Sequence, residues 1–236
     1  MSEWKLKRFW TEAAVVEAER GYEVRLDGRQ VRTPAKAALR LPNRALAEAS
    51  AEEWNAQEGA VDPMTMPVTR AANSAIDKVI PQFDEVAEMI AEYGGTDLLC
   101  YRAETPDELV RRQQDGWDPL LDWAAERLGA RLRTGAGVMY VPQDPDAIGR
   151  LDAQVRALDP FRLTPFADLV SLSGSLVLAF AVAEGARAPA DAWALSRIDE
   201  DWQIEQWGED TEASEAAAVK RAAFLDAARI FDLAGR

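Results

Sequence analysis

The sequence predicts an α+β protein, in which a small N-terminal antiparallel β module precedes a larger α-helical domain. Apolar and polar residues alternate in the first forty residues, whereas from Asn43 onward apolar residues recur every three or four positions. A segment containing Pro and Met, residues 62–67, follows the first predicted helix and is the best candidate for a domain boundary. We therefore expect an N-terminal β-rich domain over residues 1–66 and a C-terminal α-helical domain over residues 67–236.

Short alternating runs predict the strands of the N-terminal module. Residues 14–19 form one run, and residues 22–26 form a second that ends at Asp27 and Gly28. An Asp-Gly pair between alternating segments indicates a tight hairpin turn, because both residues tolerate positive φ angles. We expect the hairpin to continue over residues 29–33, and residues 38–41 to add another short strand.

Capping residues and prolines predict the limits of the helices. Asn43 is expected to cap a helix over residues 44–57. Thr105 and Glu108 have the spacing of a capping box around Pro106, so a helix is expected to begin there. Pro119 is expected to interrupt this helix and to begin another.

The remaining helices follow from apolar periodicity. Thr164 and Pro165 are expected to begin one apolar helix that continues to Glu184. Residues 131–141 are expected to form either a short strand or an extended loop. Further helices are expected over residues 69–79, 81–93, 144–158, 191–207 and 211–233.

The composition excludes several kinds of catalytic site. The chain has no histidine, which excludes Ser-His-Asp and Cys-His catalysis and histidine-containing zinc sites. Its single cysteine, Cys100, excludes an internal disulfide and a multi-cysteine metal cage. The net charge of -14 argues against non-specific binding to nucleic acid or to an anionic membrane.

Isolated residues with catalytic potential have simpler structural interpretations. Asp97 beside an apolar run is either a buried acid with a raised pKa or, more commonly, a helix cap or a hydrogen-bonded core residue. Cys100 has no base nearby in the sequence and is expected in the core. Gly135 and Gly137 lack the preceding strand and the third glycine of a dinucleotide-binding loop.

The charge is distributed unevenly along the chain. Residues 1–42 contain nine Lys and Arg against six Asp and Glu, whereas residues 199–215 contain eight acidic residues and no basic one. Such asymmetry indicates that different parts of the chain have different roles. The acidic segment is therefore the first place to look for a binding surface.

Two interpretations of the acidic segment stay open. On a helix, Ile198, Trp202 and Glu205 share one face, and Glu200, Gln203 and Trp207 share another. Arg197 is spaced to pair with Asp201 at i+4. Either the tryptophans belong to the core and the acids are solvated, or aromatic anchors among the acids form a recognition surface.

Several stretches, in order along nearly the whole chain, resemble one known family. They are Lys7–Trp10, Leu26–Arg29, Val31, Thr33–Pro34, Glu53–Gln57, Met66–Pro67, Ala75–Asp77, Thr96–Arg102, Trp117–Leu121, Asp199–Gln203 and Trp207–Gly208. With these stretches the chain resembles the assembly chaperones of the F-type ATP synthase that act on the α subunit of the catalytic head.

The resemblance implies a non-enzymatic protein with no catalytic residue, no cofactor, no metal and no small-molecule substrate. It implies that the chain binds the free α subunit and prevents its aggregation until the β subunit replaces it. Neither nucleic-acid binding nor membrane insertion is expected. The partner-binding residues that we expect, with Glu205 first among the carboxylates, are Glu205, Glu200, Asp201, Trp202, Gln203 and Trp207.

The N-terminal residues contain neither a secretory signal nor an Arg-rich presequence, so we expect a bacterial, cytoplasmic member, whereas eukaryotic relatives are mitochondrial. Two alternatives belong to other classes. One is a carboxylate-dependent hydrolase that uses Asp97, Asp199 or Glu200. The other is a stable structural subunit of a larger complex.

Overall fold

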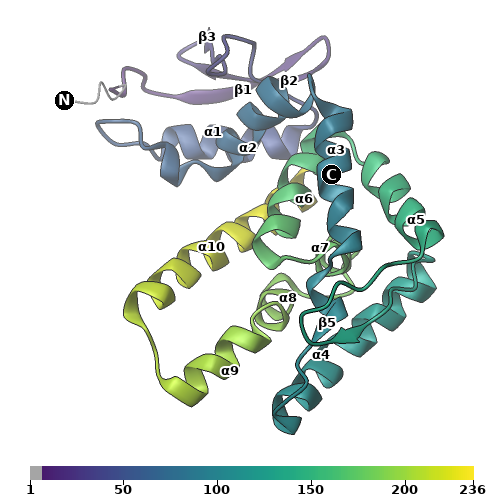
Figure 1. The fold of residues 1–236 in the computed structure, drawn as a ribbon. Coiled ribbons are helices and arrows are strands. Elements are labelled where there is room, and N and C mark those ends of the chain that lie inside the picture. The colour runs from purple at the N-terminus through teal and green to yellow at the C-terminus, as the bar shows by residue number, and fades with distance from the viewer. Residues whose placement is uncertain (1–6) are drawn as a thin grey trace. The chain divides into compact units, whose positions relative to one another are not determined.

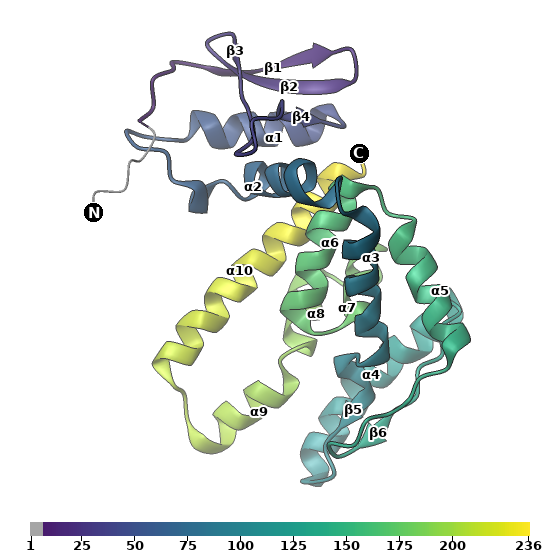
Figure 2. The same ribbon diagram turned by 45° about the horizontal axis from the view of Figure 1, so that its top comes forward.

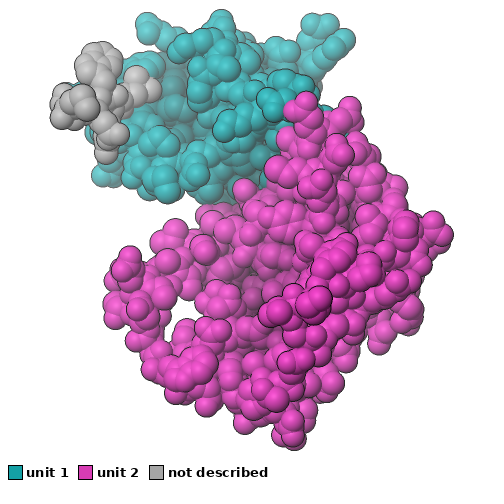
Figure 3. Space-filling model, viewed as in Figure 1, with its two compact units in different colours: residues 1–83, 160–165, 229–236 teal, residues 84–159, 166–228 magenta. Residues whose placement is uncertain are grey.

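The computed structural model describes residues 7–236 and confirms the predicted class, an antiparallel sheet followed by a mostly helical region (Figure 1). The chain divides into two units, coloured separately in Figure 3. The first continues through residue 83 and includes residues 160–165 and 229–236, and the second comprises residues 84–159 and 166–228. The first unit thus extends past residue 66, and the division into domains 1–66 and 67–236 stays a prediction.

Figures 1 and 2 show the course of the chain through its strands and helices. The strands are β1 Ala13–Ala18, β2 Gly21–Leu26, β3 Arg29–Gln30, β4 Arg40–Leu41, β5 Tyr101–Arg102 and β6 Gly135–Ala136. The α-helices are α1 Arg44–Asn55, α2 Pro67–Ser74, α3 Phe83–Ala91, α4 Asp107–Arg127, α5 Pro145–Arg156, α6 Pro160–Ser173, α7 Leu176–Ala183, α8 Pro189–Leu195, α9 Ile198–Trp207 and α10 Thr211–Ala234. Short 3₁₀ turns occur at Pro63–Thr65, Glu92–Gly95 and Leu98–Cys100, and a π-helical segment at Ala75–Val79.

The sheet of the first unit is built around the predicted hairpin. β2 pairs antiparallel with β1 along its whole length and also with β3 and β4. Asp27 and Gly28 form the turn with φ angles of 46° and 82°, as the Asp-Gly pair predicts. The Asp27 carboxylate also accepts hydrogen bonds from the backbone N–H groups of Thr11 and Glu12. This residue therefore fixes both the turn and the entry to β1.

Helix α1 packs against the sheet and orients α2 (Figure 2). The Asn43 side chain caps α1 by accepting a hydrogen bond of 2.9 Å from the Leu46 N–H, which confirms the predicted cap. From α1, the Glu53 carboxylate accepts hydrogen bonds of 2.7 and 2.8 Å from the backbone N–H groups of Val68 and Thr69. These N–H groups belong to the first turn of α2 and have no acceptor within that helix. The Glu53 side chain therefore caps α2 and joins it to α1.

Two predictions about α4 are wrong. The helix begins at Asp107, one residue later than predicted, and Pro106 occupies the cap position in extended conformation without a side-chain cap, so there is no capping box. Pro119 lies inside α4 and does not interrupt it. A proline removes one helical hydrogen bond, but here the proline is exposed, while Trp117 and Leu120 on either side are buried and hold the helix together.

Long helices predicted from apolar runs are divided in the structure. The helix expected over residues 164–184 is two helices: α6 continues through Pro165, and Gly174, with φ of 70°, separates it from α7. Ser175 caps α7 by accepting a hydrogen bond from the Leu178 N–H. The helix expected over residues 191–207 is likewise divided into α8 and α9. A run of apolar residues predicts burial well but does not reveal where a helix turns.

Asp97 holds the centre of the second unit. Its fully buried carboxylate accepts hydrogen bonds from the Leu99 N–H (3.0 Å), the Ser175 hydroxyl (2.8 Å) and the Val177 N–H (3.0 Å). Burial raises the pKa of Asp97, and the hydrogen bonds oppose this shift. The interpretation as a cap and hydrogen-bonded core residue is therefore confirmed.

Cys100 is a core residue, as expected. Its side chain is buried, and burial raises the pKa of the thiol to about 12. Within residues 7–236, no group of acidic or cysteine side chains is arranged to hold a metal ion. Over the same residues, none of the helices combines the length and the apolar character that a membrane span requires.

Candidate functional site

Helix α9 carries all six residues that were predicted to bind a partner. Asp199, Glu200 and Asp201 lie in its first turn, where negative charge stabilises a helix. The helix ends at Gly208, whose φ of 90° favours glycine. The acidic composition of this segment is therefore compatible with a stable helix, although most of its side chains are exposed.

One face of α9 is attached to α4. The indole ring of Trp202 is only 8% exposed, and the guanidinium group of Arg112 lies 4.8 Å from its ring centroid. Arg112 also forms ion pairs with Glu205 (2.8 Å) and with Glu108 (3.0 Å). The next residue of α4, Gln113, donates a hydrogen bond of 2.6 Å to the Asp199 carboxylate. These contacts place Trp202 and Glu205 on the same face of α9, as the helical spacing predicts.

A glycine in α4 permits the close approach of α9. A Cβ atom at Gly116 would lie 2.9 Å from the side chains of both Leu195 and Ile198, at the junction of α8 and α9. On the next residue, the Trp117 indole N–H donates a hydrogen bond of 2.8 Å to the Leu195 carbonyl oxygen. The absence of a Cβ atom at Gly116 and the hydrogen bond of the Trp117 indole together fix where α9 begins.

The ion pair between Arg112 and Glu205 predicts a measurable titration. The Arg112 guanidinium holds the pKa of Glu205 below its ordinary value of 4.5, because its hydrogen bond and charge favour the carboxylate. The ion pair therefore contributes fully to the stability of the folded state above about pH 4.5. This contribution is lost as the pH falls through the lowered pKa that Glu205 has in the folded state. By NMR titration we expect a midpoint below 4.5 for Glu205 and an upward shift in Arg112→Gln. An equal midpoint in both proteins would contradict the pairing.

The side of α9 that faces α4 also borders a hollow of about 390 Å³, which we call the Trp207 hollow. Trp207 is 79% exposed, and across the hollow Val138 is 97% exposed. Met139 and Tyr140 follow Val138 in the same exposed loop, which confirms the loop alternative for these three residues, whereas Gly135–Ala136 in the same segment form the short strand β6. The lining residues are Tyr101, Arg102, Ala103, Thr105, Pro106, Leu109, Gln113, Gly137, Val138, Asp199, Trp202, Gln203 and Trp207.

The structure separates the predicted residues into three groups. Trp202 belongs to the core, whereas Trp207 is exposed beside Gln203 at the hollow, so each of the two interpretations of the tryptophans holds for one of them. Glu200 pairs with Arg197 at 2.9 Å, and the expected pair of Arg197 with Asp201 is wrong. Asp201 is exposed on another side of α9.

Sequence reasoning missed two contributors to this site. Arg112 lies 93 residues from Glu205 in the chain, and nothing local marks it as a partner of α9. Val138 lies in a segment without clear periodicity, yet it is exposed and lines the same hollow as Trp207. The sequence did offer a signal for an exposed apolar loop. Val138–Tyr140 are three consecutive large apolar residues in a segment without helical or strand periodicity.

A model of the ATP12 chaperone protein family matches residues 7–125. The chain belongs to the ATP12 chaperone family. Among curated relatives, the mitochondrial protein atp12 of Schizosaccharomyces pombe is 26% identical over 223 residues, which cover 89% of this chain and 76% of that protein. The chain is thus a chaperone for ATP synthase assembly and not an enzyme.

Solved structures of bacterial proteins are similar to nearly the whole chain. The crystal structure of Atp12 from Paracoccus denitrificans is 54% identical, with a TM-score of 0.96 over 98% of this chain and 100% of that one. A variant of the Paracoccus protein with lysine in place of an aspartate has the same identity and score over 99% of this chain and 100% of that one. A structure from Agrobacterium tumefaciens is 44% identical, with a TM-score of 0.92 over 96% of this chain and 85% of that one.

The hydrolase alternative is excluded by the family, and the geometry agrees. Asp97 accepts three hydrogen bonds in the core, Asp199 is bonded to Gln113, and Glu200 is paired with Arg197. The three carboxylates therefore bind different structural partners and do not converge on one substrate position.

Proposed function

We propose that this ATP12-family chaperone binds the free α subunit of the catalytic head of the F-type ATP synthase and prevents its aggregation until the β subunit replaces it. The observation that carries the proposal is the exposure of Trp207 and Val138 on either side of the Trp207 hollow. Large exposed apolar side chains around a hollow are typical of a protein-binding surface. A tryptophan that is exposed on a helix surface is a suitable anchor.

The acidic residues around this anchor have a different role. Glu205, Glu200 and Asp201 lie within two turns of Trp207 on α9, and their side chains are at least partly exposed. Charges at the rim of an interface mainly steer association and select the partner, and they contribute modestly to affinity. A surface with one strong anchor and a charged rim therefore suits temporary binding, in which a second subunit must displace the chaperone.

The six residues predicted from the sequence are proposed as the binding surface with these roles. Trp207 and Gln203 contact the α subunit, Trp202 supports them from the core, and the three acids face basic groups of the client. We further propose that the chain acts in the bacterial cytoplasm, where the subunit is made. Neither a cofactor nor a small-molecule substrate has a part in this mechanism.

The proposal predicts protection of the isolated α subunit without ATP. At equimolar chaperone, we expect light scattering from aggregating α subunit to fall to a small fraction of its value in buffer. Glu205→Lys is expected to weaken the complex about tenfold, because it reverses a rim charge. Since Glu205 is half exposed, the melting temperature is expected to change little.

Glu85→Lys is the matched control, because Glu85 is an exposed acid on α3 of the same unit. It applies the same charge change away from α9 and is expected to leave binding unchanged. Aggregation that proceeds unaltered at stoichiometric chaperone would refute the proposal. A chaperone that stays bound in the assembled catalytic head would instead indicate the stable-subunit alternative.

A further inference from the structure

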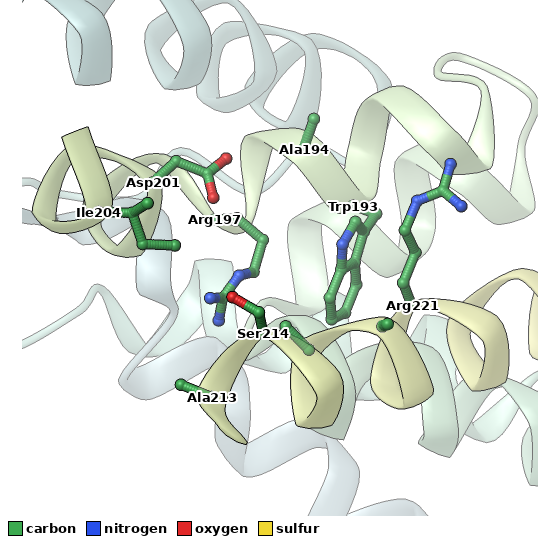
Figure 4. A pocket seen from close by; sticks show the side chains of 10 residues that line it. Trp193, Ala194, Arg197, Asp201, Ile204, Ala213, Ser214 and Arg221 are labelled. Carbon is green, nitrogen blue, oxygen red and sulfur yellow. The ribbon is translucent and has the colours of Figure 1, made fainter. Parts of the chain in front are cut away.

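Helix α9 is fastened to the second unit along the side that faces α4. The contacts with α4 run from Asp199, near the start of the helix, to Glu205, near its end. On another side, Asp201 and Ile204 line a hollow of about 270 Å³ whose far wall is formed by α10 (Figure 4). The direction in which α9 points therefore depends mainly on its contacts with α4.

Among these contacts, that of Glu205 lies nearest to the exposed Trp207. A helix rises about 1.5 Å per residue, so the two residues are about 3 Å apart along the axis of α9. The helix ends at Trp207, and the side chain of this residue is 79% exposed. Helix ends open more readily than a packed core does. The contact at Glu205 is therefore the one best placed to hold the turn that carries Trp207.

The partner of Glu205 on α4, Arg112, meets three groups at once. Its Nη1 donates a hydrogen bond of 2.8 Å to Glu205 Oε1, and its Nη2 donates one of 3.0 Å to Glu108 Oε1. Its guanidinium carbon also lies 4.8 Å from the ring centroid of Trp202. Glu108 thus fixes the guanidinium group from its own helix, while the other two contacts reach α9.

These contacts require the shape of arginine as well as its charge. A planar guanidinium stacks on an aromatic ring while its N–H groups bond to carboxylates at its edge. A lysine ammonium is a point charge on a flexible chain and does not combine these contacts in one geometry. Trp202 and Glu205 lie three residues apart and so share the face of α9 that meets this one group.

We propose that Arg112 is a positioning residue for client binding, which holds the last turn of α9 so that Trp207 is in place before the client arrives. Arg112 is not among the residues that line the Trp207 hollow, so it acts through Trp202 and Glu205. Holding a binding residue in place beforehand reduces the entropy that is lost on binding. This inference rests on the proposed function and adds a residue of α4 to it.

The sign of the effect distinguishes positioning from charge. The acidic residues of α9 are proposed to face basic groups of the client, and Arg112 adds a positive charge beside them. By charge alone, removal of Arg112 would strengthen binding. By positioning, its removal weakens binding. The two interpretations therefore predict opposite results for Arg112→Gln.

Arg111→Gln is the matched control, because it removes the same charge from the neighbouring position of α4. Arg111 is exposed, and its side chain bonds to the Asp107 carbonyl oxygen of its own helix. We expect Arg112→Gln to weaken binding of the isolated α subunit about tenfold, since the last turn of α9 must then be ordered on binding. Arg111→Gln is expected to leave the affinity unchanged or slightly higher. Titration calorimetry measures both affinities, and thermal melting checks that both variants fold.

Amide hydrogen exchange in the free chain tests the positioning itself. Arg112→Gln is expected to speed exchange in the last turn of α9, residues 204–207, and to leave exchange in α7 unchanged. A general loss of stability would speed exchange in α7 as well. Arg112→Lys keeps the charge but not the planar group, so its affinity and its exchange are expected to lie between those of Arg112→Gln and the unsubstituted chain.

The outcomes separate this inference from the proposed function. Unchanged or stronger binding by Arg112→Gln would overturn Arg112 as a positioning residue while leaving client binding intact. Weaker binding with unchanged exchange in residues 204–207 would overturn it too, because Arg112 would then act on the client directly. Equal acceleration of exchange in α7 would show a general structural role instead. No binding by the unsubstituted chain would overturn the proposed function together with this inference.

Discussion

Replacing Asp97 with alanine is expected to destabilise the second unit by about 3 kcal/mol. The substitution leaves the Leu99 N–H, the Ser175 hydroxyl and the Val177 N–H without their acceptor, and each buried donor without a partner costs roughly 1–3 kcal/mol. Removing the cost of burying the carboxyl group offsets part of this loss. Urea denaturation followed by circular dichroism measures the change.

Cys100 gives an independent measurement of the same change. Its thiol is buried and reacts with a thiol reagent only when the unit opens. A loss of about 3 kcal/mol corresponds to labelling roughly 100-fold faster under native conditions. Asp97→Asn keeps the shape of the side chain and one acceptor oxygen. Its labelling rate is therefore expected to lie between those of the unsubstituted chain and of Asp97→Ala. Identical labelling rates in Asp97→Ala and the unsubstituted chain would show that the hydrogen bonds of Asp97 do not stabilise the second unit.

Replacing Trp207 with alanine is expected to weaken binding of the α subunit about 30-fold, at little cost in stability. An interface tryptophan that acts as an anchor contributes about 2 kcal/mol or more to binding, which is roughly 30-fold in the dissociation constant. In the free chain the same side chain is 79% exposed, so its removal changes the free energy of unfolding by only about 0.5 kcal/mol or less. Titration calorimetry and thermal melting measure the two quantities.

Met89→Ala is the control for this experiment. Met89 is a large apolar residue on α3 of the same unit and is 54% exposed, but it does not line the Trp207 hollow. Its removal is expected to leave the affinity unchanged. If both variants bind the α subunit as tightly as the unsubstituted chain does, Trp207 is not an anchor and the proposed surface is misplaced.

The parts of the fold that sequence predicted correctly are those specified by adjacent residues. The turn at Asp27 and Gly28 and the cap at Asn43 depend on the conformations and hydrogen bonds of a few consecutive residues. Two of the wrong predictions concern prolines. Pro119 and Pro165 lie inside helices because buried residues on both sides outweigh the lost hydrogen bond, and such packing is not visible in a local pattern.

The location of the candidate site was predictable, but the orientation of its residues was not. The acidic run pointed to α9 through charge alone. Trp202 and Trp207 both lie on α9, but Trp202 is buried where Arg112 of α4 lies over its ring, whereas Trp207 is exposed. Such a contact depends on how α4 and α9 cross, which no spacing within either helix reveals.

The stretches that resembled the family are partly explained by structural roles. Asp27 fixes a turn, Glu53 caps α2, and Asp97 holds the start of α7. These residues join elements that are distant in sequence, so their loss affects the scaffold. Trp207 of the proposed client surface is instead largely exposed, whereas Trp202 and Glu205 of the same surface also contact α4.

The attachment of α9 has a consequence for local motion. Trp202 is the buried residue of α9, whereas six consecutive residues of α7, Leu176–Ala181, are buried. Segments with few buried apolar contacts open at a lower free-energy cost than the core does. Helix α9 therefore belongs to the fraction of the second unit that exchanges amide protons by local opening, while α7 exchanges only when the whole unit unfolds. We expect a helix mounted in this way to change its position on binding the proposed client without disturbing the core that supports it.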